Sequence, residues 1–206
     1  MLSDRDIKKE LGKNILIYPL EKENIKEASI NLTASSMAWS AKTKERLADH
    51  VEITIPAHDT ALILTREILS VSKRIAGTYH SRVIIASMGL GHIGTTLNPG
   101  WIGRSLIALH NMTDQPIKIN VGQPIVTICF YYLSTKSTVN DTNLPGRPEI
   151  LNGISLTEDE KEQYYAEYNS KKDVLKQIML KSNEFKELKK KIPKDIFLWI
   201  GLTAIL

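Results

Sequence analysis

Short apolar runs rich in β-branched residues follow one another between residues 28 and 133, and Gly, Pro, Asn or Asp separates each run from the next. An earlier run, residues 13–20, ends at Pro19. No helical pattern lies between these runs, and short strands at this spacing predict an antiparallel sandwich or barrel-like fold. The expected strands are residues 13–20, 51–55, 61–65, 82–86, 105–109, 117–119 and 125–132.

Helical signals occur near both ends of the chain. Residues 4–11 predict a short N-terminal helix with Ser3 or Asp4 as its N-cap. Near the C-terminus, Thr157 and Glu160 form a capping box that opens a long helical stretch.

The long helical stretch carries one apolar stripe and continues to Ile192, just before a proline. Lys171 and Ser182 interrupt the stripe. Its members recur at steps of three, four or seven residues: Tyr164, Tyr168, Leu175, Ile178, Phe185, Leu188 and Ile192. This helix either packs on its own domain or joins copies of the chain as a coiled coil.

These patterns divide the chain into four parts. Residues 1–135 form a β-rich domain, and residues 136–155 are polar and turn-rich, which is typical of a linker or arm. Residues 156–192 form the amphipathic helix, and residues 193–206 form an apolar terminal segment.

The terminal segment suggests membrane contact. Residues 196–206 carry no charge and follow a lysine cluster. Eleven residues are too few to span a bilayer, which takes about 20, but basic residues followed by Trp and aliphatic residues resemble the start of a membrane anchor. We therefore expect membrane contact through residues 186–206. A surface anchor or a tail buried against a partner are the alternatives.

Composition narrows the remaining classes of function. The formal charge is +4, and the few aromatic residues are not interleaved with the basic ones. This pattern disfavours nucleic-acid binding. The single cysteine, Cys129, excludes a disulfide within the chain and a cysteine-based zinc site. The five histidines lack metal-ligand spacing, so no metal site is predicted. A reducing compartment fits, and we expect a cytoplasmic protein, attached to the cytoplasmic face of a membrane if the terminal segment is an anchor.

One segment resembles a known family. Residues 94–103 (GTTLNPGWIG) resemble the I-D-P-G-(F/W)-x-G segment of the dCTP deaminase/dUTPase superfamily, and in particular its dCTP deaminase-like branch. Further matches occur in the family's order over roughly residues 1–135: Met1–Ile7, Ala28–Leu32, Ile55–Pro56, Leu64–Glu67, Ile75–Gly77, Ser81–Arg82, Met88–Leu90 and Gly122–Ile125.

The resemblance implies a mainly β protein. We expect a compact antiparallel dUTPase-like fold, called a β-clip, with a short N-terminal helix and a long C-terminal helix. It also implies a homotrimer with active sites between subunits. In the deaminases of this family a glutamate activates water for attack on cytosine C4, and Mg²⁺ accompanies the triphosphate. In the dUTPases an aspartate activates the water.

Several positions depart from the family pattern. Ala108 stands where the deaminase glutamate belongs, and Asn98 stands where the D-P-G aspartate belongs. In the phosphate-contact motif R-S-S-x-x-R, Arg82 persists, but Val83 replaces the first serine and Ser87 the second arginine. Asn31 and Thr127 replace a further aspartate and a glutamine. Loss of a general base alone costs about 10²–10⁴ in rate.

The sequence therefore predicts a catalytically degenerate protein that binds or senses a pyrimidine deoxynucleotide, or acts as a scaffold. We expect no catalytic residue, no resident cofactor, and Mg²⁺ only with a bound triphosphate. The expected binding residues are Arg82, Ser87, Gly94, Thr95, Thr96, Asn98 and Trp101. Two alternatives stay open. One is an active dCTP deaminase or dUTP diphosphatase with a relocated catalytic group, and the other is a structural trimer without a ligand. The candidates for a relocated group are Asp49, Asp59, Glu67, His92 and His110.

Overall fold

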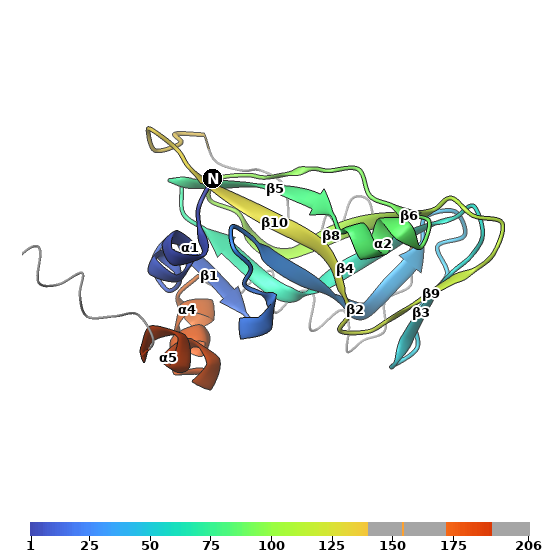
Figure 1. Ribbon diagram of the computed structural model, residues 1–206, viewed down its shortest axis with the longest axis horizontal. Helices are drawn as coiled ribbons and strands as arrows, with labels where there is room; N and C mark the ends of the chain where they lie inside the picture. Colours follow the sequence, from blue (N-terminus) through green and yellow to red (C-terminus); the bar gives the residue numbers. More distant parts are fainter. Residues whose placement is uncertain (140–153, 155–171, 191–206) are drawn as a thin grey trace, which may run out of the picture.

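Strands dominate the protein (Figure 1). The computed structural model describes residues 1–139, 154 and 172–190. The strands are β1 (Ile15–Tyr18), β2 (Ile30–Ser40), β3 (Glu52–Ile55), β4 (Thr60–Val71), β5 (Ile75–Ser81), β6 (Leu90–Gly91), β7 (Thr96–Leu97), β8 (Ile102–Asn111), β9 (Ile117–Asn120) and β10 (Pro124–Tyr132). The helices are α1 (Asp4–Glu10), the 3₁₀ turn η1 (Lys22–Asn24), α2 (Val83–Ser87), α4 (Lys172–Lys181) and α5 (Asn183–Lys190).

The strands form one long antiparallel sheet in the order β6-β8-β4-β2-β10-β5-β7, with β1 added to β4. A separate pair, β3 and β9, extends from one end of the molecule (Figure 1). Pairing of β2 with β4 shifts register between Ala34 and Ala38, and pairing of β4 with β8 shifts between Leu64 and Ile68. Such shifts bend and twist long strands. The predicted mainly β, antiparallel fold is confirmed.

Alternating side chains of the sheet build the core. Along β8, buried and partly exposed residues alternate without interruption, so Ile107 and Leu109 point inward. They join a cluster that includes Ile7, Ile128 and Phe130, each fully buried. Each such side chain stabilises the fold by about 1.5–3 kcal/mol relative to exposure. The alternation of side chains between the two faces of a strand therefore gives the sheet its buried face.

A smaller apolar cluster lies on the opposite face of β2, β4 and β8. Its buried members are Met37, Trp39, Leu62 and Leu64, and Leu106, Ala108 and Ile154 pack at its border. Leu62 of β4 lies opposite Ala108 of β8 in the sheet register. The sheet therefore buries apolar side chains on both faces at this point.

The N-terminal helix agrees with its prediction. Ser3 is the N-cap of α1, and its Oγ accepts from the backbone N–H of Asp6 at 3.2 Å. The carboxylate of Asp6 accepts from the backbone N–H of Ser3 at 3.2 Å in return. This reciprocal pair satisfies two backbone donors that would otherwise lack partners.

The strand predicted at 82–86 is wrong, because this segment forms the short helix α2. The carbonyl of Arg82 accepts from the backbone N–H groups of Ile85 at 3.0 Å and Ala86 at 2.9 Å. Only Ile85 is buried, whereas Val83 and Ile84 are exposed. The β-branched run pairs with no strand here, and β-propensity gives way to tertiary context.

The C-terminal helix is not continuous over its described part. Ser182 separates α4 from α5: its Oγ donates to the Met179 carbonyl at 2.8 Å and accepts from the Phe185 N–H at 3.3 Å. A serine bonded to the backbone in this way ends one helix and caps the next. The single helix expected over 156–192 is therefore corrected to two helices within residues 172–190.

These two helices pack on their own domain. Leu175, Met179, Phe185 and Leu188 are buried in the main core, and the ammonium of Lys189 donates to the Lys8 carbonyl at 2.7 Å. Figure 1 shows α4 and α5 beside α1 and β1. The apolar stripe was expected either to pack on its own domain or to form a coiled coil. Residues 172–190 favour packing within one chain.

The remaining C-terminal predictions fall largely outside the described residues. These are the linker or arm at 136–155, apart from 136–139 and 154, the helix start at 156–171 and the terminal segment at 193–206. Among the helices that the structure describes, none has the length and apolar character to cross a bilayer. The membrane contact expected through 186–206 stays a prediction.

Candidate functional site

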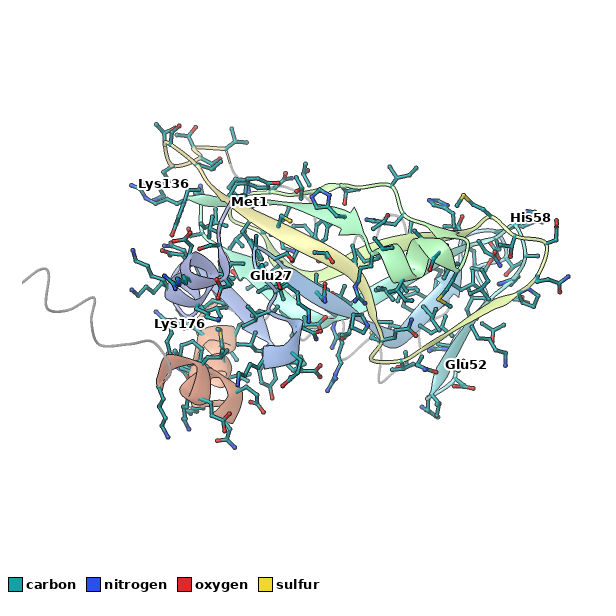
Figure 2. All side chains as sticks on the ribbon, in the orientation of Figure 1. Met1, Glu27, Glu52, His58, Lys136 and Lys176 are labelled. Atoms are coloured by element: carbon teal, nitrogen blue, oxygen red, sulfur yellow. The ribbon has the colours of Figure 1, made fainter. Side chains whose placement is uncertain are left out.

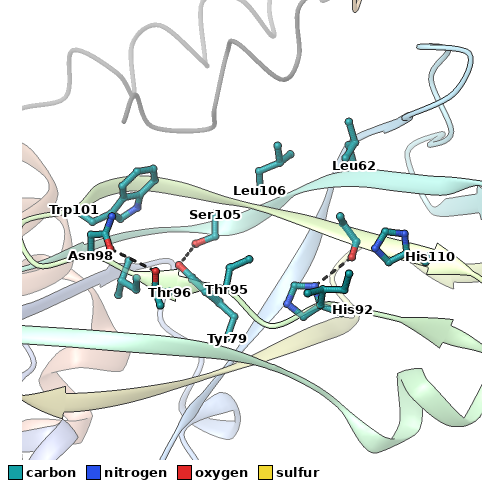
Figure 3. Close-up of a pocket in the computed structure, with 13 residues that line it drawn as sticks. Leu62, Tyr79, His92, Thr95, Thr96, Asn98, Trp101, Ser105, Leu106 and His110 are labelled. Atoms are coloured by element: carbon teal, nitrogen blue, oxygen red, sulfur yellow. Dashed lines mark hydrogen bonds between the residues drawn. The ribbon is translucent and has the colours of Figure 1, made fainter. Parts of the chain in front are cut away.

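A cavity of about 450 Å³ opens between β5, β7 and β8 (Figure 3). The loops on either side of β7 close its ends, and Leu62 reaches it from β4. The lining residues are Leu62, Tyr79, His92, Ile93, Thr95, Thr96, Leu97, Asn98, Trp101, Ser105, Leu106, Ala108 and His110. This volume lies within the range of small-molecule sites.

A tight turn positions two of the expected binding residues. The backbone N–H of Trp101 donates to the carbonyl of Asn98 at 3.2 Å. Gly100 has a φ of +89°, and Pro99 precedes it. Proline followed by a glycine with positive φ is typical of a type II turn. The N-P-G-W sequence thus fixes Asn98 and Trp101 at the same end of the cavity.

Gly94 supports the cavity without lining it. A Cβ at this position would lie 2.8 Å from the carbonyl oxygen of Tyr79. The absence of a side chain lets the loop lie against β5, where the N–H of Tyr79 donates to the Thr95 carbonyl at 2.9 Å. Gly94, which was selected from the sequence as a binding residue, is not among the lining residues, and its close packing sets the path of Thr95 and Thr96.

Two hydroxyl groups form part of the cavity wall. The Tyr79 hydroxyl and Ser105 Oγ are 2.6 Å apart, and both residues are buried. Burial raises the pKa of Tyr79 to about 12, so the phenol keeps its proton at neutral pH. Sequence reasoning did not select this pair, because Tyr79 and Ser105 belong to strands that are distant in sequence.

Ala108 lies in the cavity wall, between the cavity and the smaller apolar cluster. Its methyl group neither accepts nor donates a proton. No Asp or Glu occurs among the described residues that line the cavity, and no Lys or Arg does either. The wall at the expected glutamate position is therefore neutral and largely apolar.

Two histidines border Ala108. His92 Nδ1 lies 3.2 Å from the Ala108 carbonyl, which can only accept, so Nδ1 carries the proton. Burial lowers the pKa of His92 below its ordinary value, which favours the neutral ring. His110 Nδ1 lies 2.8 Å from Thr60 Oγ1 across the β4–β8 pair. Figure 3 shows both rings at the same end of the cavity.

The expected binding residues separate into two groups. Thr95, Thr96, Asn98 and Trp101 line the cavity. Besides Gly94, the other two residues contact their own chain elsewhere. Arg82 donates from Nη1 to the Pro124 carbonyl at 2.6 Å, and Ser87 donates from Oγ to the Ile84 carbonyl at 3.0 Å.

Two further departures from the family pattern contact each other. Thr127 donates from Oγ1 to Asn31 Oδ1 at 2.7 Å, and the two residues are direct neighbours across β10 and β2. Neither lines the cavity. The pair satisfies its own polar groups, so these positions stabilise the sheet.

The acidic candidates for a relocated catalytic group also bind their own chain. Glu67 is buried and accepts from the Thr33 N–H at 2.9 Å and from Thr33 Oγ1 at 2.7 Å. Asp59 accepts from Ser40 Oγ at 2.6 Å, and Asp49 accepts from the backbone N–H of Glu52 at 2.6 Å. None of the three lines the cavity.

The described residues hold no group of three or more His, Cys, Asp or Glu side chains arranged to bind a metal ion. Magnesium prefers carboxylate and phosphate oxygens. The cavity offers hydroxyls, one amide and two imidazoles instead. These groups do not fit Mg²⁺.

Comparison with known proteins places the chain in a family. The family described as dCTP deaminase-like matches residues 1–133. A dCTP deaminase of Thermococcus kodakarensis is 30% identical over 133 residues, which cover 65% of this chain and 83% of that protein. A dUMP-forming dCTP deaminase of Methanopyrus kandleri is 29% identical over 160 residues, covering 66% of this chain and 83% of that protein.

A solved structure supports the fold. The crystal structure of 2'-deoxycytidine 5'-triphosphate deaminase from Agrobacterium tumefaciens superposes with a TM-score of 0.54 at 13% identity. The match covers 63% of this chain and 46% of that chain. With the family match over residues 1–133 and the antiparallel sheet around the cavity, the chain belongs to the dCTP deaminase-like family.

Proposed function

We propose that the protein binds a pyrimidine deoxynucleotide-class ligand in the cavity beside β8 without converting it. One observation carries this proposal: Ala108 stands in the wall where the resemblance expects a glutamate, and no carboxylate is among the described lining residues. Deamination requires a group that takes a proton from water and returns it to the leaving ammonia. An alanine methyl cannot do either.

The acidic side chains of the same domain do not replace the missing base. Glu67 is held by Thr33, and Asp59 is held by Ser40. Moving either carboxylate into the cavity would leave a buried hydroxyl or N–H without its partner, at a cost of about 1–3 kcal/mol for each group. The geometry therefore favours binding over turnover.

His92 supports the rival proposal of an active enzyme. Its ring lies against the Ala108 carbonyl, and a neutral imidazole can accept a proton through Nε2. In this second proposal His92 takes over the role of the glutamate, and the protein is a dCTP deaminase or a dUTP diphosphatase.

A homotrimer is also part of the proposal. The resemblance places active sites between subunits, and the cavity of one chain contains neither Arg82 nor Ser87. A second copy could present α2 to this cavity. The exposed Val83 and Ile84 would then add apolar surface to the site.

A turnover assay tests the proposal. Purified protein is incubated with dCTP or dUTP and Mg²⁺, and ammonia, dUTP and dUMP are measured. We expect turnover to be lower by at least about 10²–10⁴ than that of a family member that has the glutamate. Rapid turnover that disappears in His92→Phe but persists in His58→Phe would favour the rival proposal. His58 is a matched control, because it lies on an exposed loop (Figure 2) and does not line the cavity.

A further inference from the structure

We infer that the cavity selects an unphosphorylated ligand of the nucleoside class, a compound with a pyrimidine-like edge and no phosphate. This inference rests on the proposed binding without conversion, and it restricts the ligand to the base and sugar of a deoxynucleotide, without the phosphates. The family resemblance alone would suggest a triphosphate.

The first argument is charge. None of the described lining residues is Asp, Glu, Lys or Arg, and burial lowers the pKa of His92, which favours its neutral ring. A phosphate is bound well by guanidinium groups, by ammonium groups or by several N–H donors. An anion placed among neutral side chains loses its hydration without such compensation.

The second argument concerns the groups that the resemblance assigns to phosphate. The guanidinium of Arg82 donates to the Pro124 carbonyl, and Ser87 Oγ donates to the Ile84 carbonyl. Val83, in place of a serine, is 85% exposed and offers only a hydrocarbon surface. Even a second copy that presents α2 to the cavity would therefore bring an apolar side chain and two groups already bonded within their own chain.

The third argument is a pair of unpaired polar atoms. Three buried side-chain nitrogens in the described part of the chain lack a hydrogen-bond partner, and two of them, His92 Nε2 and Trp101 Nε1, belong to cavity-lining residues. Such atoms are rare in folded proteins, because each costs about 1–3 kcal/mol.

The chemistry of these two atoms defines the ligand. Because His92 Nδ1 carries the proton, Nε2 is an acceptor, and Trp101 Nε1–H is a donor. A ligand that carries both an N–H and a carbonyl or ring-nitrogen acceptor would satisfy both, as the edge of a cytosine or uracil does. Neighbouring atoms cover both nitrogens, so pairing requires each ring to turn toward the cavity.

Calorimetry on the full-length protein tests the inference. Deoxycytidine and deoxyuridine are titrated, and dCTP and dUTP are titrated with and without Mg²⁺. We expect each nucleoside to bind at least as tightly as its triphosphate, with no dependence on Mg²⁺. A triphosphate that binds tenfold or more tightly than its nucleoside would overturn the inference, and so would a nucleoside that does not bind at millimolar concentration.

Two matched pairs of variants test the assigned atoms. Trp101→Phe keeps an aromatic ring and removes the N–H, so nucleoside affinity should fall about three- to tenfold. Trp39→Phe is its control, because Trp39 also has a buried, unpaired N–H but does not line the cavity. His92→Phe should weaken binding similarly, whereas His58→Phe should not. Equal effects within either pair would contradict the assignment.

Different experimental results would contradict the inference and the proposed function. A tightly bound triphosphate that is not converted would end the inference and leave the proposed function intact. Conversion of dCTP or dUTP at the rate of a working family member would end the proposed function, whichever ligand binds more tightly.

Discussion

At the scale of single residues, the buried carboxylate of Glu67 stabilises the strands through Thr33 and does not face the cavity. Burial raises the pKa of Glu67 above its ordinary value of 4.5. A raised pKa means that the folded state favours the protonated acid. The contribution of the protonated Glu67 to the stability of the fold is therefore complete below pH 4.5. This contribution is lost as the pH rises through the pKa of Glu67 in the folded state.

Glu67→Gln should therefore gain stability relative to the natural protein as the pH rises from 4.5 toward neutrality. The glutamine does not titrate, and its amide can still bond both Thr33 groups. Melting temperatures of the two proteins over this pH range measure the difference. Asp49→Asn is a useful contrast, because hydrogen bonds lower the pKa of Asp49. The contribution of Asp49 to the stability of the fold is therefore lost as the pH falls, in the opposite direction to that of Glu67. A constant difference in melting temperature for Glu67→Gln would contradict the prediction.

Ala108 permits a direct test that the cavity is the binding site. Ala108→Leu adds apolar volume beside Leu62 and Leu106. The leucine side chain is compatible with these apolar neighbours, but it fills part of the cavity that the ligand would occupy. We expect affinity for the bound ligand to fall at least about tenfold while the fold persists. Ala28→Leu, at a partly exposed position that does not line the cavity, is the control for the same change. Unchanged affinity in Ala108→Leu would place the ligand elsewhere.

At the scale of secondary-structure elements, α4 and α5 belong to the core of their own domain. Phe185 is buried, and its ring contacts the position where a Cβ of Gly12 would lie. Phe185→Ala should lower the free energy of unfolding by about 3–5 kcal/mol. Ile178→Ala should cost less than about 1 kcal/mol, because Ile178 is 42% exposed.

This pair separates packing within one chain from a coiled coil. Phe185 and Ile178 both belong to the stripe predicted from the sequence, so a coiled coil would make them comparably important. Chemical denaturation at two protein concentrations measures both effects. Similar losses for the two variants, together with a midpoint that rises with protein concentration, would favour the coiled coil.

At the scale of the whole molecule, the proposal of a trimer predicts the mass in solution. Light scattering after size-exclusion chromatography should give three times the 23.2 kDa of the chain. A closed threefold ring gives each cavity the same neighbour, and closed symmetry is usual among soluble oligomers. A mass of one chain at micromolar concentration would contradict the trimer and would mean that the cavity is complete within one copy.

Local signals in the sequence determined a large part of this protein. The short apolar run at residues 105–109 predicted β8, and the Ser3 cap predicted α1. The N-P-G-W segment was selected by its resemblance to a family motif, and it forms the turn that holds Asn98 and Trp101. These features depend on neighbours within a few residues, so the sequence alone is sufficient to predict them.

Only the tertiary structure decided which distant groups meet. The run at 82–86 forms a helix that pairs with no strand, and Ser182 separates two helices that both reach the core. Arg82 points to the Pro124 carbonyl rather than into the cavity, and His92 reaches the Ala108 carbonyl. Such contacts depend on the register and bending of strands that are far apart in sequence, which the local pattern of residues does not specify.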